Sequence, residues 1–305
     1  MNNSSKSVLI SGTSGFVGSA IYSKFLENNW QICTLGRNKK YDVFCDFSKP
    51  LEMLKLKLPL KKFDICIHIA AANEVICMQN PVQAYNINCC GTHALAEICK
   101  FYKIKNFFYI STFHVFGNQT GYLDEKSKPI PNNLYGLSHQ ICEQDLLMSD
   151  MNNYFKTKII RLPNIIGVPH SWHDFDRWTL AQFDFCKQCN EVQNIALNSS
   201  GEQVRNWVNL EFVSEKILDY AENLNYEKIH HIVGQNLSVI QLAKMIAETW
   251  ELNFKQKINI SIPLNSHELK VKNDRNFSTE NMENKSTNLK IDNFVSKVGL
   301  YLKRS

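Results

Sequence analysis

Long apolar runs are missing from this sequence. The most apolar internal stretch, FDICIHIAAANEVIC (63–77), is shorter than the roughly 20 residues of a membrane-spanning helix and contains charged side chains. The amino-terminal MNNSSKSVLIS has one lysine but no apolar segment of signal-peptide length. We therefore expect a soluble, cytoplasmic protein that makes no membrane contact.

Patterns typical of metal sites, disulfide frameworks and nucleic-acid binding are lacking too. The one CxxC, at Cys186 and Cys189, has neither a second pair nor a metal-spaced histidine, and His170, His173 and Asp174 have no further partner, so we predict no metal. The ten cysteines are scattered through a large chain without a secretion signal, which favours reduced, mostly buried thiols. Its short basic runs (37–40 and 55–62) are not interleaved with aromatics, so the net charge of +5 does not indicate nucleic-acid binding.

Alternating strand-like and helix-like segments fill the first half of the chain. Apolar runs such as ICIHI and FFYIS are typical of central parallel strands covered by helices on both faces. The alternation predicts an α/β fold with a doubly wound parallel sheet, a Rossmann domain over residues 1–165. Residues 166–305 are less regular apart from a helix-like segment at 238–250. We expect them to form a smaller α/β substrate lobe, with some segments returning to the first domain.

A glycine-rich turn follows the first predicted strand. In VLISGTSGFVGSAIY the glycines Gly12, Gly15 and Gly18 lie between a strand and a helix, which is the context that a dinucleotide-binding turn requires. Such glycines permit a tight turn and close approach of a pyrophosphate, while the helix amino terminus supplies N–H groups. We predict that the turn binds the cofactor phosphates, together with Ser14, Phe16 and Val17.

Cofactor choice is indicated after the second predicted strand. Sites that prefer NAD usually carry an acidic residue there, but this chain has Gly36 and Arg37. A guanidinium suits a 2′-phosphate, so the sequence favours NADP, with NAD as the alternative if Arg37 is only a solvated loop residue. Asp46, after a short strand, is placed to accept a hydrogen bond from the adenine amino group.

These and further motifs resemble the extended short-chain dehydrogenase/reductase superfamily, especially its members that modify nucleotide sugars. The similar segments run over nearly the whole chain: DICIHIAAANEV, NINCCGTHALAEICK, FFYISTFHVFG, PNNLYGLSHQICEQ, IIRLPNIIG and GEQVRNWVNLEFV. The resemblance implies that Ala70, Ala71, Ala72, Asn88 and Ser111 belong to the cofactor site.

The resemblance also implies catalytic and substrate-binding residues. Thr112 aligns with the hydroxyl that hydrogen-bonds the reacting oxygen, and Tyr135 with the group that moves its proton. Asn164 and Arg205 resemble positions that contact the nucleotide diphosphate, for which a guanidinium is well suited. Their alternatives are a loop cap and a surface ion pair.

Residues after Thr112 bear on the type of reaction. Dehydratases of this group usually have an Asp-Glu pair there, whereas this chain has Phe113 and His114, so elimination of water is disfavoured. His114 is a candidate substrate-binding residue, with a structural role as the alternative. The STFHVFG segment and the tail NDRNFSTENM, which contains Arg275, resemble dTDP-4-dehydrorhamnose reductase-type proteins. The segment GEQVRNWV is closer to epimerases and decarboxylases.

The catalytic helix departs from the family pattern at His139, where a lysine is usual. A cation about 6 Å from the tyrosine, at an effective dielectric of about 20, is worth roughly 3 kcal/mol, or about two pKa units. A mostly neutral His139 loses this effect, unless Glu143, one turn away, raises its pKa. Such a histidine still donates one hydrogen bond to a ribose hydroxyl, and a reductase, which needs a protonated tyrosine, tolerates the change better than an enzyme that begins by oxidation.

We therefore expect an NADP(H)-dependent oxidoreductase that reduces a 4-keto group of a nucleotide-linked sugar, with Tyr135 as proton donor. An epimerase and a catalytically silent NADP-binding sensor or scaffold are the alternatives. Helix-like segments 84–102 and 134–149 are expected to pair two subunits in a homodimer, although their apolar residues are equally suited to packing on the sheet.

Overall fold

The computed structural model describes residues 6–304 except 60–61, 174, 225–226, 264–274, 281–282, 284 and 287. Asp174 and the ends of the NDRNFSTENM segment thus lie outside the described residues. Contacts divide the chain into two compact units. The first unit comprises Met1–Gln119, Glu125–Leu162 and Ser214–His231, and the second comprises Thr120–Asp124, Pro163–Val213 and Ile232–Ser305.

A seven-stranded sheet of parallel strands forms the centre of the first unit, as the sequence predicted. In spatial order the strands are β11 (Ile229–His231), β7 (Lys156–Leu162), β5 (Asn106–Thr112), β4 (Ile65–His68), β1 (Ser7–Ser11), β2 (Gln31–Gly36) and β3 (Val43–Phe44). The direction of winding reverses between β1 and β4. Ligands of doubly wound sheets bind beyond the carboxyl ends of the strands at such a point.

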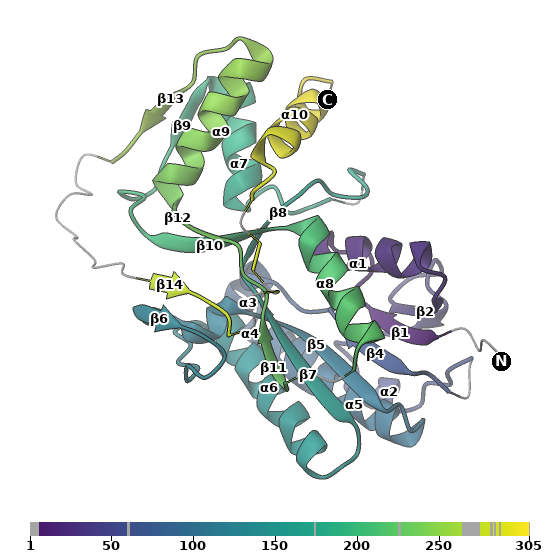
Figure 1. Cartoon of the computed structure of the whole chain (residues 1–305). Helices are drawn as coiled ribbons and strands as arrows, with labels where there is room; N and C mark the ends of the chain where they lie inside the picture. The colour runs from purple at the N-terminus through teal and green to yellow at the C-terminus, as the bar shows by residue number, and fades with distance from the viewer. Residues whose placement is uncertain are drawn as a thin grey trace. The chain divides into compact units, whose positions relative to one another are not determined.

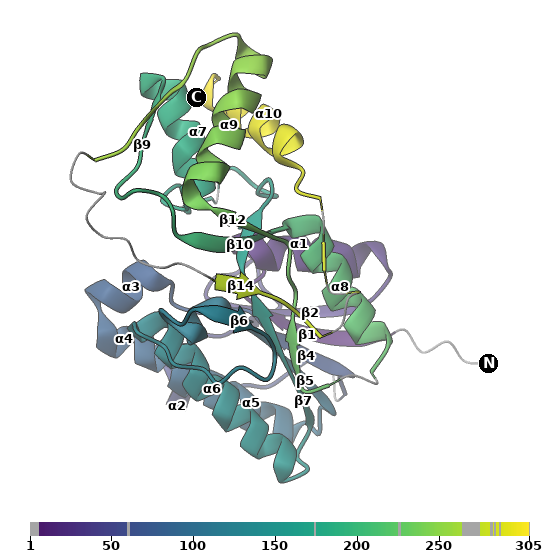
Figure 2. The same cartoon turned by 60° about the vertical axis from the view of Figure 1, so that its left-hand side comes forward.

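Helices cover both faces of this sheet (Figures 1 and 2). One face carries α1 (Phe16–Glu27) and α8 (Leu210–Glu222), which are joined by the ion pair between Lys24 and Glu215 (3.5 Å). The other face carries α2 (Pro50–Met53), α3 (Glu74–Gln79), α4 (Pro81–Tyr85), α5 (Gly91–Phe101) and α6 (Leu134–Met151). Helix α6 begins where the Asn133 side chain accepts a hydrogen bond from the Gly136 backbone N–H.

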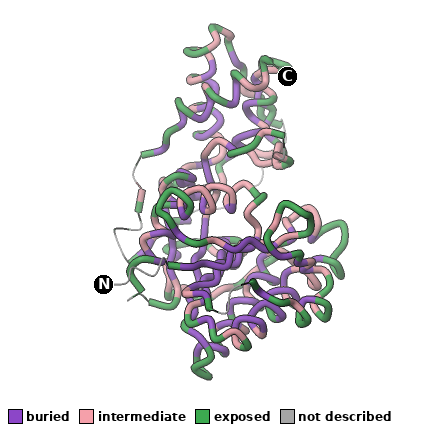
Figure 3. The backbone as a smooth tube through the Cα atoms, turned by 90° about the vertical axis from the view of Figure 1, so that its right-hand side faces the viewer, coloured by how far each residue is buried: buried purple, intermediate pink, exposed green. Residues whose placement is uncertain are grey.

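Burial follows the predicted pattern, since β1 and β4 are buried at every residue and β5 at all but its first (Figure 3). The segment expected as one helix over 84–102 is instead interrupted by a π-helical turn, η1 (Asn86–Cys90), between α4 and α5. All ten cysteines are free thiols, and only Cys89 and Cys90 are not buried. Within the described chain, no helix is long and apolar enough to cross a membrane.

The second unit contains three small sheets and three helices among its described residues. Its strands pair as β12 (Gln235–Ser238), β10 (Val204–Asn209) and β8 (Asn164–Ile166); β13 (Asn259–Ser261) and β9 (Asn194–Ala196); and β14 (Arg275–Phe277) and β6 (Gly121–Leu123). The helices are α7 (Ala181–Val192), α9 (Val239–Phe254) and α10 (Ile291–Leu302). Helix α9 opens with a capping box between Ser238 and Gln241, and α7 carries Cys186 and Cys189 on its buried face.

Candidate active site

The glycine-rich turn connects β1 to α1 at the reversal point of the sheet. Gly12 has a φ of +78°, and a Cβ there would lie 2.6 Å from the Ala70 nitrogen. A Cβ at Gly18 would lie 2.0 Å from the Gly12 carbonyl oxygen. Gly15, by contrast, has room for a Cβ, but like Ser14 it is exposed beside the first turn of α1, which carries no acidic residue. The turn therefore presents backbone N–H groups to an anion.

Arg37 and Asp46 flank the carboxyl end of β2. Arg37 is exposed and makes no hydrogen bond or ion pair with the described residues, so its guanidinium is available to a ligand. One oxygen of Asp46 accepts hydrogen bonds from the backbone N–H (3.0 Å) and hydroxyl (2.7 Å) of Ser48. These bonds fix the carboxylate in a local turn.

The alanine-rich turn after β4 is held from beneath by Asn88. The Asn88 amide accepts a hydrogen bond from the Ala72 N–H (2.6 Å) and donates one to the Ser138 hydroxyl (2.9 Å) on α6. Because Asn88 is only 1% exposed, it orients the turn and does not itself face a ligand, which refines its expected place in the cofactor site. Ala71, between Ala70 and Ala72, is exposed.

Thr112 ends β5 at the start of the 3₁₀ helix η2 (Phe113–Phe116). Its hydroxyl accepts a hydrogen bond from the His114 N–H (3.2 Å), so the hydroxyl hydrogen remains available to donate. His114 is exposed, whereas Phe113 is buried against Phe116 and His231.

Tyr135 lies between two histidine rings at the start of α6. Its ring meets that of His139 edge to face at a centroid distance of 4.6 Å, and that of His114 at 5.3 Å. Tyr135 also packs against the small apolar cluster of Ala72, Cys77 and Ala84. The structure thus brings the rings of His114, Tyr135 and His139 together.

His139 is buried, 2% exposed, and neutral. Burial, with a smaller contribution from His114, lowers its pKa to about 3. Its Nδ1 lies 2.8 Å from the Tyr109 hydroxyl, and its Nε2 has no hydrogen-bond partner among the described residues.

The expected help from Glu143 is absent. Its carboxylate pairs with Arg161 on β7 (2.7 Å from Nη2 and 3.0 Å from Nε) and accepts a hydrogen bond from the Ser111 hydroxyl (2.5 Å). Glu143 is therefore paired within the core, and it does not raise the pKa of His139, which burial lowers. The Ser111 hydroxyl also donates to Glu143 in the core, and its place in the cofactor site stays a prediction.

A second buried histidine, which sequence reasoning missed, supports both turns. His68 at the end of β4 bonds through its ring nitrogens to the hydroxyls of Ser11 (2.6 Å) and Thr92 (2.9 Å). The Ser11 hydroxyl in turn accepts a hydrogen bond from the Ala70 N–H (3.3 Å). Burial lowers the pKa of His68 to about 3. The apolar run ICIHI marked this position as buried, but not its partners.

Two arginines lie near one another in the second unit. Asn164 begins β8 and donates a hydrogen bond to the Asn206 carbonyl (3.2 Å) on β10, where Arg205 is partly buried. Burial lowers the pKa of Arg275 on β14, and the Arg205 charge lowers it further. Burial alone lowers the pKa of Arg205. Two partly desolvated cations therefore lie near each other on β10 and β14. Across the described residues, no cluster of three or more potential metal ligands occurs.

Comparison with known proteins supports the fold. The dTDP-D-glucose 4,6-dehydratase of Homo sapiens is 28% identical over 269 residues, which cover 80% of this chain and 73% of that protein. The UDP-glucose 4-epimerase of Thermotoga maritima has a similar fold, with a TM-score of 0.78 at 17% identity, covering 98% of this chain and 99% of that one. The dTDP-4-dehydrorhamnose reductase of Yersinia enterocolitica gives 0.72 at 21% identity, covering 98% and 99%.

A family model assigns the chain to a protein family. The model described as the NAD dependent epimerase/dehydratase family matches residues 8–232, which include the glycine-rich turn, Thr112, Tyr135 and His139. The chain therefore belongs to the NAD dependent epimerase/dehydratase family, the extended short-chain dehydrogenases/reductases, whose enzymes use NAD(P) on nucleotide sugars.

Proposed function

We propose that the protein is an NADP(H)-dependent reductase of a 4-keto group on a nucleotide-linked sugar, with Tyr135 as the proton donor. The observation that carries the proposal is the neutral, buried His139 one helical turn from Tyr135. No cation is present at this position to favour the phenolate, so Tyr135 keeps its proton and serves as an acid.

The residues of the first unit fit a dinucleotide. The close approaches at Gly12 and Gly18 allow no side chain at these two positions of the turn, and the Nε2 of His139 has no partner within the described residues. We assign the pyrophosphate to the turn from Gly12 to Gly18, a 2′-phosphate to Arg37, and a ribose hydroxyl to His139. When bound, the nicotinamide supplies the hydride.

Thr112 and Tyr135 supply the rest of the chemistry. The free hydroxyl hydrogen of Thr112 donates to the carbonyl oxygen of the substrate and polarises it. Tyr135 donates its proton to the same oxygen as negative charge develops there. The flanking rings of His114 and His139 restrict the orientation of the phenol.

Dehydration is disfavoured by the two residues after Thr112. Phe113 is buried and has no proton to exchange, and exposed His114 stands where a second acidic residue is usual. The human relative is named as a dehydratase, but this chain lacks the acidic pair that elimination of water needs.

Arg205 and Arg275 support a nucleotide diphosphate as the handle of the substrate. Burial lowers the pKa of Arg275, and the nearby Arg205 charge lowers it further. A diphosphate relieves the repulsion between the two charges and accepts several charge-assisted hydrogen bonds. Asn164, on the neighbouring strand β8, is assigned to the same substrate.

The experiment is a screen of 4-keto nucleotide sugars for oxidation of NADPH and NADH, with products identified by mass spectrometry. We expect turnover with NADPH, and losses on the order of 10²- to 10⁴-fold in kcat for Tyr135→Phe. Leu137→Ala, on an exposed position of the same helix, serves as the control. Conversion of a nucleotide sugar without net consumption of NADPH supports an epimerase instead.

The same histidine favours a second candidate, a cofactor-binding protein without turnover. The usual lysine both holds the ribose and lowers the pKa of the tyrosine, and His139 retains only the first capacity. Tight NADPH binding with no reaction on any nucleotide sugar would support this sensor or scaffold.

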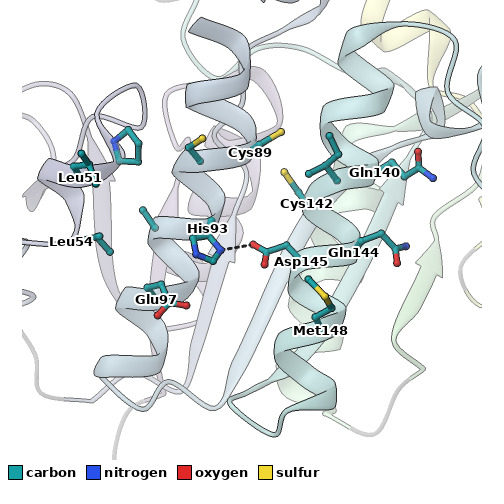
Figure 4. A pocket seen from close by; sticks show the side chains of 14 residues that line it. Leu51, Leu54, Cys89, His93, Glu97, Gln140, Cys142, Gln144, Asp145 and Met148 are labelled. Atoms are coloured by element: carbon teal, nitrogen blue, oxygen red, sulfur yellow. Dashed lines mark hydrogen bonds and ion pairs between the residues drawn. The ribbon is translucent and has the colours of Figure 1, made fainter. Parts of the chain in front are cut away.

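We further propose a homodimer formed through a groove between α2, α5 and α6 (Figure 4). The groove encloses about 730 Å³ and includes the exposed apolar side chains of Leu51, Ile141 and Met148. Within the groove, the His93–Asp145 pair (2.9 Å) joins α5 to α6 (Figure 4). A second copy of the same helices buries this apolar surface symmetrically.

A further inference from the structure

We infer that Tyr109 is a positioning residue that holds His139 as the Nε2–H tautomer, so that Nε2 donates a hydrogen bond to a ribose hydroxyl of the cofactor. The cofactor contact rests on the proposed function. The tautomer itself does not.

The contact joins two elements of the first unit. Tyr109 on β5 and His139 on α6 are 30 residues apart, and their hydroxyl and Nδ1 are 2.8 Å apart. The two rings lie at a centroid distance of 5.6 Å with an interplanar angle of 38°. Both side chains are 2% exposed, so water does not compete for the bond.

The proton in this bond belongs to Tyr109. Burial raises the pKa of Tyr109 well above its usual value, so the phenol stays protonated and has one hydrogen to donate. Two acceptors lie within reach, the Nδ1 of His139 and the sulfur of Cys142. Sulfur is the weaker acceptor, and the Cys142 thiol donates its own hydrogen to the Asn88 carbonyl (3.2 Å).

The tautomer of His139 follows from the choice of Nδ1 as the acceptor of the Tyr109 hydrogen. A neutral imidazole carries one hydrogen, and Nδ1 accepts from Tyr109, so the hydrogen is on Nε2. Nε2 is buried and has no partner among the residues that the structure describes. A buried donor without an acceptor is costly, and a bound ligand can supply the acceptor. A ribose hydroxyl is such an acceptor, and it is the group that the lysine usual at this position would hold.

The first test observes the tautomer in the protein without cofactor or substrate. Long-range ¹H–¹⁵N NMR on the ¹⁵N-histidine-labelled chain separates the two ring nitrogens, and His139→Gln assigns the signals. We expect a single neutral Nε2–H tautomer from pH 6 to pH 8, and loss of this pattern in Tyr109→Phe. An Nδ1–H tautomer or an imidazolium in this range would overturn the inference.

The second test measures the Kd of NADPH by fluorescence in a double-mutant cycle. Tyr109→Phe should raise Kd by about two- to tenfold, the effect of one net hydrogen bond. In a His139→Lys background, Tyr109→Phe should raise the Kd of NADPH by less than about twofold, because an ammonium has no tautomer to fix. Equal costs in both backgrounds would contradict the positioning role.

Tyr102→Phe is the matched control, since its hydroxyl accepts a hydrogen bond from the Leu58 N–H (2.9 Å) away from His139. It should leave the Kd of NADPH and the His139 signals unchanged. Thermal unfolding of each variant separates loss of folding from loss of the hydrogen bond. If no ketosugar is reduced but both tests succeed, the reductase proposal fails and the role of Tyr109 stands.

Discussion

Burial determines the charge of the two histidines nearest the cofactor turns. Helical spacing correctly placed Glu143 on the same side of α6 as His139, and yet it did not identify their partners. Glu143 forms an ion pair with Arg161, and His139 shares a hydrogen bond with Tyr109. Arg161 and Tyr109 both lie on strands and are distant from their partners in sequence. These pairs depend on the register of β5 and β7, which the sequence alone does not specify. The catalytic roles of Tyr135 and Thr112, by contrast, are predicted from motifs and stay predictions.

The buried histidines predict an acid-sensitive fold. His68 and His139 have pKa values of about 3 in the folded protein, against about 6.5 when unfolded. Below pH 6.5 the unfolded chain binds protons that the folded chain does not, so the free energy of unfolding falls with falling pH. Between pH 6.5 and pH 5 each histidine should cost about 2 kcal/mol.

Denaturant unfolding at several pH values tests this expectation. His139→Gln should reduce the loss between pH 6.5 and pH 5 by about 2 kcal/mol, because one titrating group is removed. His170→Gln, at an exposed position, should leave the pH dependence unchanged. A wild-type pH dependence in His139→Gln would show that His139 is not buried in the neutral form.

At the scale of elements, the site depends on a close contact between α6 and η2. A Cβ at Gly136 would lie 2.3 Å from the His114 carbonyl oxygen, so only glycine permits the present approach of the two backbones. The π-helical turn η1 also supports the site, because it places Asn88 between Ala72 and Ser138. The sequence predicted helices here but could not reveal the extra residue in the turn.

Gly136→Ala should therefore displace η2 from α6. We expect a loss of stability of about 1–3 kcal/mol and a lower kcat, because Thr112 begins η2 and Tyr135 begins α6. Leu137→Ala, at the neighbouring exposed position of α6, is the control for a general effect of substitution in this helix. Chemical unfolding and NADPH oxidation measure the two effects. Unchanged stability in Gly136→Ala would mean that the backbones are farther apart than described.

At the scale of the whole molecule, the alternation of strands and helices was sufficient to predict the doubly wound sheet. Apolar runs mark central parallel strands, and the glycine pattern marks the first turn. The second unit was predicted only in outline, because its short strands pair across long sequence separations, as β14 does with β6. Quaternary structure depends on surface shape, which sequence periodicity does not describe.

The groove between α2, α5 and α6 predicts how the oligomeric state responds to a buried charge. Ile141→Asp places a carboxylate in the apolar surface of the proposed interface, and the dimer should dissociate. Leu252→Asp, at an exposed apolar residue of α9 outside the groove, should not change the mass. Sedimentation equilibrium distinguishes the two. A monomeric wild-type protein at micromolar concentration would contradict the dimer.

The most direct test of the central claim, that a neutral His139 leaves Tyr135 to act as an acid, is the pH–rate profile of His139→Lys in the oxidative direction. A lysine cation stabilises the phenolate, so we predict a shift of the profile toward lower pH by about two units relative to wild type. A profile that does not move would contradict the account, because the charge at position 139 would then have no influence on the proton of Tyr135.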